Sequence, residues 1–259
     1  MLEFFPSRTV AVEIFGLQIH WYGLMYLLGF VLTYYLLSRL FKYRNVNMNK
    51  DGIANLLSWG VLGVILGGRL GFVLFYEPSY YLSNPLDIVK VWQGGMSSHG
   101  GFLGVITVLI IYTRKKNIDL LSLLDLLVIP VAIGLALGRL GNFINGELYG
   151  FETALPWAMS FPDAEGLRHP TQIYALVKDL FIAASCFYYL KRGAKKGQVF
   201  SLFLILYGLL RFLVEYFREQ PYGLVDLGII ELSRGQALTV PLIVTGVAVW
   251  IWARHGHET

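Results

Sequence analysis

Seven long apolar runs recur along the 259-residue chain, and they constrain its fold more than any other feature. An α-helix needs roughly 20 predominantly apolar residues to cross a bilayer core of about 30 Å. Most of the runs approach that length, and each is apolar all round, as a membrane helix should be. They cover residues 16–37, 53–76, 98–112, 120–137, 173–190, 199–217 and 238–253. The sequence therefore predicts an all-α polytopic membrane protein with seven transmembrane helices.

The composition agrees with a chain that lies largely in lipid. Hydrophobic residues make up 56% and charged residues only 15%, whereas soluble domains are about 25% charged. These values exclude disorder and argue against an ordinary soluble enzyme. We expect one integral-membrane domain over residues 1–259, with a long outer loop at 139–170 that lies partly in the membrane interface.

Lys and Arg are divided unequally between alternate loops. Twelve of the 21 lie in one set of loops and the carboxyl-terminal tail, six lie in the other set, and three lie inside the runs. The loops richer in Lys and Arg face the cytoplasm. The amino terminus is then predicted to be periplasmic and the carboxyl terminus cytoplasmic. The run at 98–112 is the shortest, and its flexible first turn leaves a re-entrant segment as an alternative.

Small residues recur at helical spacing in several runs. The spacing of four predicts close helix packing, and it relates Gly63, Gly67 and Gly71, Gly100 and Gly104, and Gly134 and Gly138. The tetrapeptide Gly-Arg-Leu-Gly occurs at 68–71 and again at 138–141. Four residues are too few to establish an internal repeat.

Polar side chains in and beside the runs gather toward one membrane face, the outer one. They are His20, Tyr22, Arg69, His99, Arg139, Asn142, Asn145, Glu147, His169, Gln172, Tyr174, Tyr207, Arg211, Glu215 and Arg218. Polar residues that serve only helix packing would be distributed over both membrane faces. Their convergence predicts a functional site near the outer leaflet.

The run at 199–217 carries one polar stripe. At 100° per residue, Tyr207, Arg211, Glu215 and Arg218 fall within about 80° of one another. Inserting an arginine near the bilayer centre costs about 2.5–3.5 kcal/mol of free energy. A buried arginine is therefore expected to have an anionic partner. A pair between Arg211 and Glu215 is the purely structural alternative, but it leaves Arg218, Arg139 and Arg69 on the same side. We favour an anionic substrate, since the planar guanidinium binds phosphate with two parallel hydrogen bonds.

His99 lies in a glycine-rich segment, residues 94–101. Glycines allow a backbone to approach a ligand closely, and imidazole is the usual general base near neutral pH. We therefore take His99 as the candidate base, with a packing role as the alternative. His20 is better explained, beside Trp21 and Tyr22, as part of an interfacial aromatic belt.

Other chemistries find no support in the sequence. It contains no Gly-x-Ser-x-Gly nucleophile segment and no His, Asp or Glu spacing typical of a metal site. The lone Cys186 excludes an intramolecular disulfide and is expected to be buried and inert. We expect no metal, no cofactor and no nucleic-acid partner.

The segment 138–150 indicates one particular protein family. Gly-Arg-Leu-Gly-Asn-Phe-Ile-Asn-Gly-Glu-Leu-Tyr-Gly resembles, at all thirteen positions, the signature of the prolipoprotein diacylglyceryl transferases of bacterial inner membranes. Segments 20–23, 94–101 and 169–172, and the residues from Tyr207 to Arg218, match the family in the same order. One departure is visible, because Ala175 stands where the family usually has Glu; Asp179, one turn further on, is the candidate replacement.

The resemblance implies an enzyme of the cytoplasmic (inner) membrane whose active site faces the periplasmic leaflet. Its partners would be phosphatidylglycerol, the lipobox peptide of a preprolipoprotein and the surrounding membrane lipids. The diacylglyceryl group would pass to the lipobox cysteine sulfur, forming a thioether and releasing glycerol phosphate. The leaving phosphate needs charge stabilisation rather than an enzyme nucleophile. That need agrees with the outer arginines and with the lack of a nucleophile in the chain.

The candidate residues divide into two groups. The catalytic group is His99, Arg139, Arg211 and Tyr22. The substrate-binding group is Arg139, Asn142, Asn145, Glu147, Gly150, Tyr207, Arg218 and His169. The alternative function is a lipid transporter or flippase with an outer-leaflet site for anionic lipid, although transporters usually bind near the midplane between repeats. A purely structural scaffold would not need this cluster.

Overall fold

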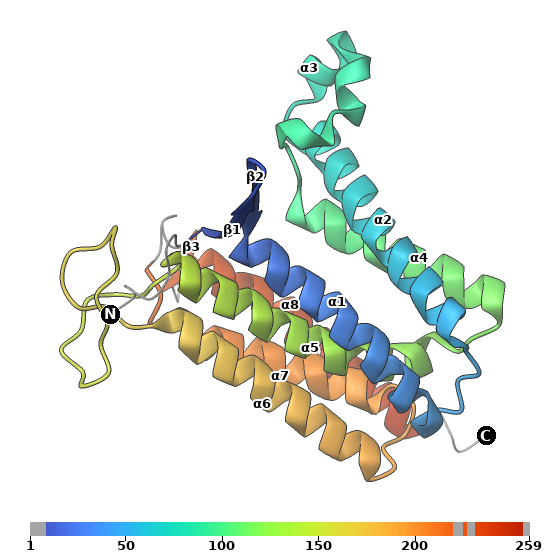
Figure 1. The fold of residues 1–259 in the computed structure, drawn as a ribbon. Coiled ribbons are helices and arrows are strands. Elements are labelled where there is room, and N and C mark those ends of the chain that lie inside the picture. Colours follow the sequence, from blue (N-terminus) through green and yellow to red (C-terminus); the bar gives the residue numbers. More distant parts are fainter. Residues whose placement is uncertain (1–8, 220–224, 227–230, 256–259) are drawn as a thin grey trace. The chain divides into compact units, whose positions relative to one another are not determined.

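The computed structural model describes residues 9–219, 225–226 and 231–255, and helices dominate it (Figure 1). The long helices are α1 (Trp21–Leu40), α2 (Lys50–Phe75), α4 (Ser98–Lys116), α5 (Leu120–Asn145), α6 (Thr171–Lys191), α7 (Gln198–Glu215) and α8 (Arg234–His255). The short helices are η1 (Phe41–Tyr43), α3 (Pro78–Ser83), η2 (Pro85–Val89) and η3 (Val91–Gln93). The strands β1 (Val10–Ile14) and β2 (Leu17–His20) form one antiparallel pair, and β3 (Val225–Asp226) and β4 (Glu231–Leu232) form another.

Each of the seven apolar runs contains one long helix. Within the described residues, six of these helices are long and apolar enough to cross a membrane, and α4 falls outside that group. The chain is thus a multi-pass membrane protein. The prediction of a helix at 98–112 is confirmed, because α4 is regular from Ser98 and its first turn is capped by the Ser97 side chain, which accepts from the Gly100 N–H at 3.2 Å. A seventh crossing stays a prediction.

Three predicted boundaries are wrong. The first run does not begin a helix at Gly16, because Leu17–His20 is a strand and Phe15 and Gly16 form a tight hairpin turn with φ of 50° and 79°. The helix α5 continues to Asn145, so the outer loop begins there and not at 139. The helix α7 ends at Glu215, before the predicted end at 217.

The described chain divides into two compact units, residues 45–123 and residues 1–44 together with 124–259. In the first unit, α2 and α4 lie side by side. A Cβ at Gly67 would meet the Gly100 carbonyl oxygen and the Gly104 backbone, and a Cβ at Gly71 would lie 2.8 Å from the Gly100 Cα. The predicted close packing is therefore confirmed for this pair. It is not confirmed for Gly138, whose Cβ position meets nothing within 4 Å, whereas the Gly134 Cα lies 3.7 Å from a Cβ placed at Gly29 on α1.

The second unit is a bundle of α1, α5, α6, α7 and α8 (Figure 1). One buried carboxylate ties it together at one end. Asp125 on α5 is fully buried and accepts hydrogen bonds from Gly197 N and Phe200 N, both at 2.8 Å, where α7 begins. Arg44, at the end of the α1 segment, completes the group with Nη2 2.8 Å from the carboxylate. The Asp125 side chain thus satisfies N–H groups that a helix start leaves without partners.

Candidate active site

A narrow cavity lies between α5, α6 and α7 in the second unit, and arginines form much of its wall. It is lined by Arg139, Leu148, Thr171, Gln172, Ala175, Arg211, Val214 and Arg218. Its volume of about 10 Å³ holds about one water molecule. A lipid headgroup can therefore enter only when side chains of the wall move. The structure brings together three of the predicted residues, Arg139, Arg211 and Arg218, from two helices and the segment that follows α7.

Three cationic side chains line this cavity. Arg211 pairs with Glu215 through Nη2 and Oε2 at 2.7 Å. The ion pair considered as the purely structural explanation of Arg211 is therefore present. Burial, together with the charges of Arg211 and Arg139, lowers the pKa of Arg218, although the Glu215 carboxylate opposes this shift. Three guanidinium groups, those of Arg139, Arg211 and Arg218, thus line one cavity, and that of Arg211 is paired with Glu215. Because arginine keeps its charge in proteins, the cavity favours an anion.

A second buried ion pair lies beside the arginines. Lys178 and Asp179, adjacent on α6, pair with each other and are 7% and 1% exposed. The Lys178 Nζ lies over the Tyr207 ring, 4.2 Å from its centroid. This contact holds the Tyr207 ring beside Lys178, and the Tyr207 hydroxyl interacts electrostatically with Arg139 and Arg211. Tyr207 is therefore held between one buried ion pair and the arginine cluster.

The end of α5 carries a small polar network. The Glu147 Oε1 atom accepts from the Asn142 side chain at 2.8 Å and from the Asn145 side chain at 3.3 Å. Asn142 is buried, whereas Glu147 is exposed. Glu147 therefore orients both asparagines, and no bond from it to an arginine is seen among the described contacts. This fixed arrangement explains why α5 continues through residues expected to lie in a loop.

The beginning of α6 is fastened to this same turn. Thr171 donates from its hydroxyl to the Leu148 carbonyl at 2.7 Å, and Gln172 donates from Nε2 to the Glu147 carbonyl at 2.7 Å. Gln172 is 2% exposed, and its Oε1 finds no hydrogen-bond partner among the described residues. A buried acceptor without a partner is costly, so this oxygen is a candidate contact for a bound ligand. Gln172 was predicted to lie toward the outer face but was not among the predicted binding residues.

Two predicted binding residues, Gly150 and His169, contact other parts of the protein and do not line an open space. Gly150 donates its N–H to the His169 carbonyl at 2.9 Å, and a Cβ there would collide with the Phe217 carbonyl oxygen. The His169 ring packs against Phe217 at 5.2 Å between centroids, and its Nδ1 lies 3.0 Å from the Tyr174 hydroxyl. Both residues therefore shape the wall behind the cavity, and their contact with a substrate stays a prediction.

Tyr22 lies next to the arginine-bearing turn of α5. A Cβ at Gly141 would meet the Tyr22 ring at 2.9 Å, so only glycine lets α1 approach so closely. The Tyr22 hydroxyl accepts from that of Tyr26 at 3.4 Å. The structure thus places Tyr22 beside the helical turn that carries Arg139.

Arg69 uses its donors on the backbone of its own unit. It lies in the 45–123 unit, is 4% exposed, and donates five hydrogen bonds to backbone carbonyls at 2.5–3.4 Å. A guanidinium has five N–H donors, so none remains for a phosphate. The interpretation of Arg69 as part of an outer anion cluster is wrong, because the loop after α2 folds back over it.

His99 lies exposed in the first turn of α4, in the 45–123 unit. The glycines around it have structural tasks. Gly94 and Gly95 have φ of 87° and 73°, and their carbonyls accept from Arg69, while Gly100 packs on α2. These glycines are therefore explained by the fold and do not by themselves indicate a ligand site. The role of His99 as a base stays a prediction.

An open hollow of about 550 Å³ adjoins the narrow cavity. It is lined by Gly146, Glu147, Leu148, Tyr149, Asp163, Arg218 and Glu219, and it shares Leu148 and Arg218 with the cavity. Arg218 therefore lies at the junction between a space that admits a headgroup and the buried arginines. This position agrees with a part in guiding substrate inward.

Comparisons with known proteins decide the family. A sequence model of the prolipoprotein diacylglyceryl transferases matches residues 9–252. The chain belongs to this family. It is 45% identical over 256 residues to a phosphatidylglycerol–prolipoprotein diacylglyceryl transferase of Bordetella parapertussis, with 97% of each chain covered. It is 45% identical to one from Methylibium petroleiphilum, with 94% and 95% covered, and 46% identical to one from Nitrosomonas europaea, with 94% and 89% covered.

The departure from the usual transferase sequence lies on the cavity wall. Ala175 lines the cavity beside the arginines. Asp179, the expected replacement for the missing Glu, is fully engaged by Lys178 and does not line it. The cavity wall therefore carries a methyl group at position 175, and Asp179 does not supply a carboxylate in its place.

Two further predictions concern cysteine and metal chemistry. Cys186 is 0% exposed, as expected for a residue of the core. Within the described part of the chain, no group of three His, Cys, Asp or Glu residues could hold a metal ion.

Proposed function

We propose that this chain transfers the diacylglyceryl group of phosphatidylglycerol to the lipobox cysteine of preprolipoproteins. The thiol sulfur forms a bond to the glycerol carbon, and the bond between that carbon and the phosphate oxygen breaks. The electron pair leaves with glycerol phosphate, and the thiol proton passes to a base. The reaction balances without a cofactor. The observation that carries the proposal is the cavity lined by three arginines, Arg139, Arg211 and Arg218.

Arg139 and Arg211 are assigned to the phosphate. They approach one cavity from different helices, α5 and α7, so together they can follow charge that grows on the phosphate oxygens as the carbon–oxygen bond breaks. Arg218, at the junction with the open hollow, would guide phosphatidylglycerol or the peptide inward. Tyr207 would keep the guanidinium groups in position.

The neutral groups are assigned to the headgroup glycerol. Asn142 and Asn145 are oriented by Glu147, and amides can both donate to and accept from hydroxyl groups. Gly150 and His169 hold the wall close to these residues. His99 would take the thiol proton, with Tyr22 assisting, because a thiol must become a thiolate before it attacks.

The proposed setting is the bacterial inner membrane. Seven spans with a periplasmic amino terminus and a cytoplasmic carboxyl terminus follow from the unequal distribution of Lys and Arg. The active site then faces the periplasmic leaflet, and residues 1–259 act as one catalytic domain. The loop before α6, with Phe151, Trp157 and Leu167 at 45%, 56% and 50% exposure, would lie partly in the interface. Reporter fusions at Lys115 and Lys195 should both report from the cytoplasm; a periplasmic signal at either would reverse the orientation.

The deciding experiment joins the purified full chain, phosphatidylglycerol and a synthetic lipobox peptide. Mass spectrometry should find the peptide heavier by one diacylglyceryl group and an equal amount of glycerol phosphate in solution. A peptide with Ser in place of the cysteine should stay unmodified. Movement of labelled lipid between leaflets with no change in the peptide would favour the flippase alternative, for which the family comparisons give no support.

A further inference from the structure

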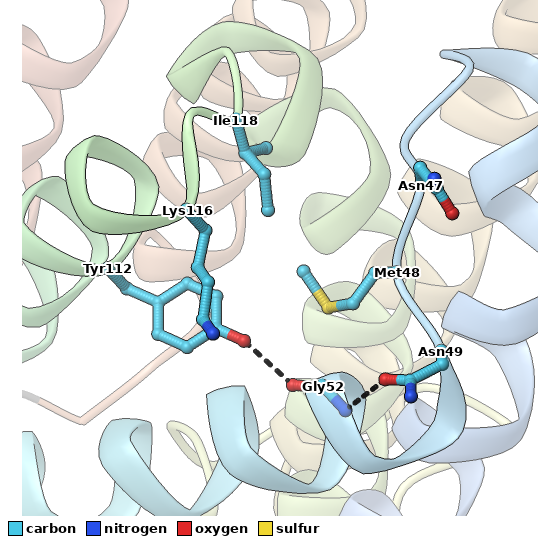
Figure 2. A pocket seen from close by; sticks show the side chains of 7 residues that line it. All are labelled: Asn47, Met48, Asn49, Gly52, Tyr112, Lys116 and Ile118. Carbon is cyan, nitrogen blue, oxygen red and sulfur yellow. Dashed lines mark hydrogen bonds between the residues drawn. The ribbon is translucent and has the colours of Figure 1, made fainter.

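Two adjoining hollows lie at one end of the α2–α4 pair, in the 45–123 unit and outside the arginine cavity. The first, of about 320 Å³, is lined about equally by polar and apolar surface and is drawn in Figure 2. It is lined by Asn47, Met48, Asn49, Gly52, Tyr112, Lys116 and Ile118. The second, of about 350 Å³, is mostly apolar and is lined by Asn55, Trp59, Val108, Ile111, Tyr112, Lys115 and Lys116. Tyr112 and Lys116 belong to both, so the two hollows form one continuous groove.

The first hollow has a fixed frame. Asn49 caps α2 by accepting from the Gly52 N–H at 2.9 Å, and the Tyr112 hydroxyl donates to the Gly52 carbonyl at 2.9 Å. Figure 2 shows these two bonds meeting at Gly52, with the Lys116 side chain extended beside them. The first turn of α2 and the last turns of α4 are thus tied together.

The lysines of the groove are placed by the end of α4. Asn117 adopts a left-handed conformation with φ of 52° and closes the helix. Lys115 and Lys116 therefore occupy its last turn, where the helix dipole favours positive charge. Both side chains are exposed, and no ion pair is seen for either among the described residues. Their amino groups are available to an anion.

The apolar half of the groove faces outward along helices that pack in the membrane. Trp59 and Ile111 are each 49% exposed, and α2 is long and apolar enough to span a bilayer. A tryptophan at this depth, one or two turns from the basic helix ends, is typical of the membrane interface. The groove therefore changes from apolar to cationic along its length, as a phospholipid changes from acyl chain to headgroup.

We propose that this groove binds an anionic phospholipid of the leaflet at this end of the helices, which is the cytoplasmic leaflet in the proposed orientation. The phosphate lies at Lys115 and Lys116, the glycerol region faces Asn49, and an acyl chain follows Trp59. Basic recesses between membrane helices bind such headgroups. A soluble anion would use the lysines but leave the apolar half empty. The site is independent of the proposed transfer reaction, since none of its residues belongs to the arginine cavity.

The test uses the purified full chain in detergent and measures thermal stabilisation during titration with dioleoyl phosphatidic acid. Its matched variants are Lys115→Gln/Lys116→Gln in the groove and Arg114→Gln, which removes charge from the same turn but lines neither hollow. We expect the double variant to bind about 30-fold more weakly, corresponding to about 1 kcal/mol for each lysine. Arg114→Gln should bind as the unaltered chain does.

A second comparison tests the acyl-chain half. Trp59→Ala should weaken binding of the dioleoyl lipid and leave binding of dihexanoyl phosphatidic acid nearly unchanged. Equal losses in Arg114→Gln and the double variant would overturn the proposal in favour of diffuse attraction. Equal stabilisation by inorganic phosphate would show a soluble-anion site, and equal binding of dioleoyl phosphatidylcholine would show an apolar groove without headgroup recognition. All three results contradict the site proposed here.

Discussion

The tetrapeptide Gly-Arg-Leu-Gly occurs in both units of the molecule, and its two arginines have opposite environments. Arg69 on α2 gives all five of its donors to the carbonyls of Asp87, Ile88, Lys90, Gly94 and Gly95. Arg139 on α5 lines a cavity with two other arginines. The local sequence is the same and both copies lie near the end of a helix. The difference must therefore come from what the chain does after the helix.

After α2 the chain folds back through α3, η2 and η3. Gly94 and Gly95, both at positive φ, turn their carbonyls toward Arg69, and the Tyr81 ring lies 5.0 Å from its guanidinium. After α5 the chain instead turns into α6, whose first residues fasten the connection with Thr171 and Gln172. No such cage of carbonyls is described around Arg139. An arginine caged by backbone stabilises a loop, whereas an arginine among like charges attracts an anion.

The largest loss of turnover from a single substitution is expected at His99. This residue is the predicted catalytic base of the 45–123 unit. If Arg69 is structural, this unit acts in catalysis through His99. The His99→Gln variant should fold and bind lipid, but turnover should fall by about 10²–10⁴-fold, the usual worth of acid–base catalysis. Product formation by purified protein measures it, with His255→Gln at the end of α8 as a control. Near-normal turnover would reduce His99 to a packing residue and leave chemistry to the other unit.

The next effect separates the two arginines directly. Arg139→Lys and Arg211→Lys keep a charge but lose the planar fork, so each should lower kcat/KM by about 10²–10³-fold, as removal of a transition-state donor does. Arg69→Lys, expressed per folded molecule, should stay within about threefold of the unaltered chain. Equal activity in all three variants and the unaltered chain would eliminate the clamp on phosphate. Unfolding of Arg211→Lys would instead favour a purely structural pair with Glu215.

The third effect concerns stability and runs in the opposite direction. Lysine cannot reach the carbonyls around Arg69 in a fork, so Arg69→Lys should lose at least one charged hydrogen bond, worth about 1.5–3 kcal/mol. For a chain of this size that corresponds to a fall of roughly 3–12 °C in the unfolding midpoint. Arg139→Lys and the exposed Arg39→Lys should change the midpoint little. A midpoint of Arg139→Lys as low as that of Arg69→Lys would erase the distinction between the two copies.

The sequence predicted the helices better than the residues between them. Apolar runs are long and regular, so seven helices and the glycine packing of α2 on α4 followed from them. The extension of α5 to Asn145 did not, because Asn142 finds its partner in Glu147, five residues later, only after the chain has turned. The role of Arg69 was missed for the same reason, since its carbonyl partners are 18–26 residues away. Gln172 could have been found from its place in the segment 169–172, but nothing there shows that Oε1 lacks a partner.

The smallest loss of activity is expected at Arg218. It tests whether the outer arginine guides the substrate while Arg139 and Arg211 stabilise the transition state. Arg218 borders both the narrow cavity and the open hollow of about 550 Å³, so it meets substrate before Arg139 and Arg211 do. A residue that guides an anion needs its charge more than its fork, and lysine keeps the charge. Arg218→Lys should therefore lower kcat/KM by less than about tenfold, mainly by raising KM, because it removes binding made equally in the ground and transition states. Arg218→Gln should raise KM further, and the penalty should grow at low salt, where guidance by charge is strongest. Steady-state kinetics at two ionic strengths measure both variants. If Arg218→Lys lowered kcat by as much as Arg139→Lys, the phosphate would be held by three arginines that act together, and the separation into guiding and reacting groups would be wrong.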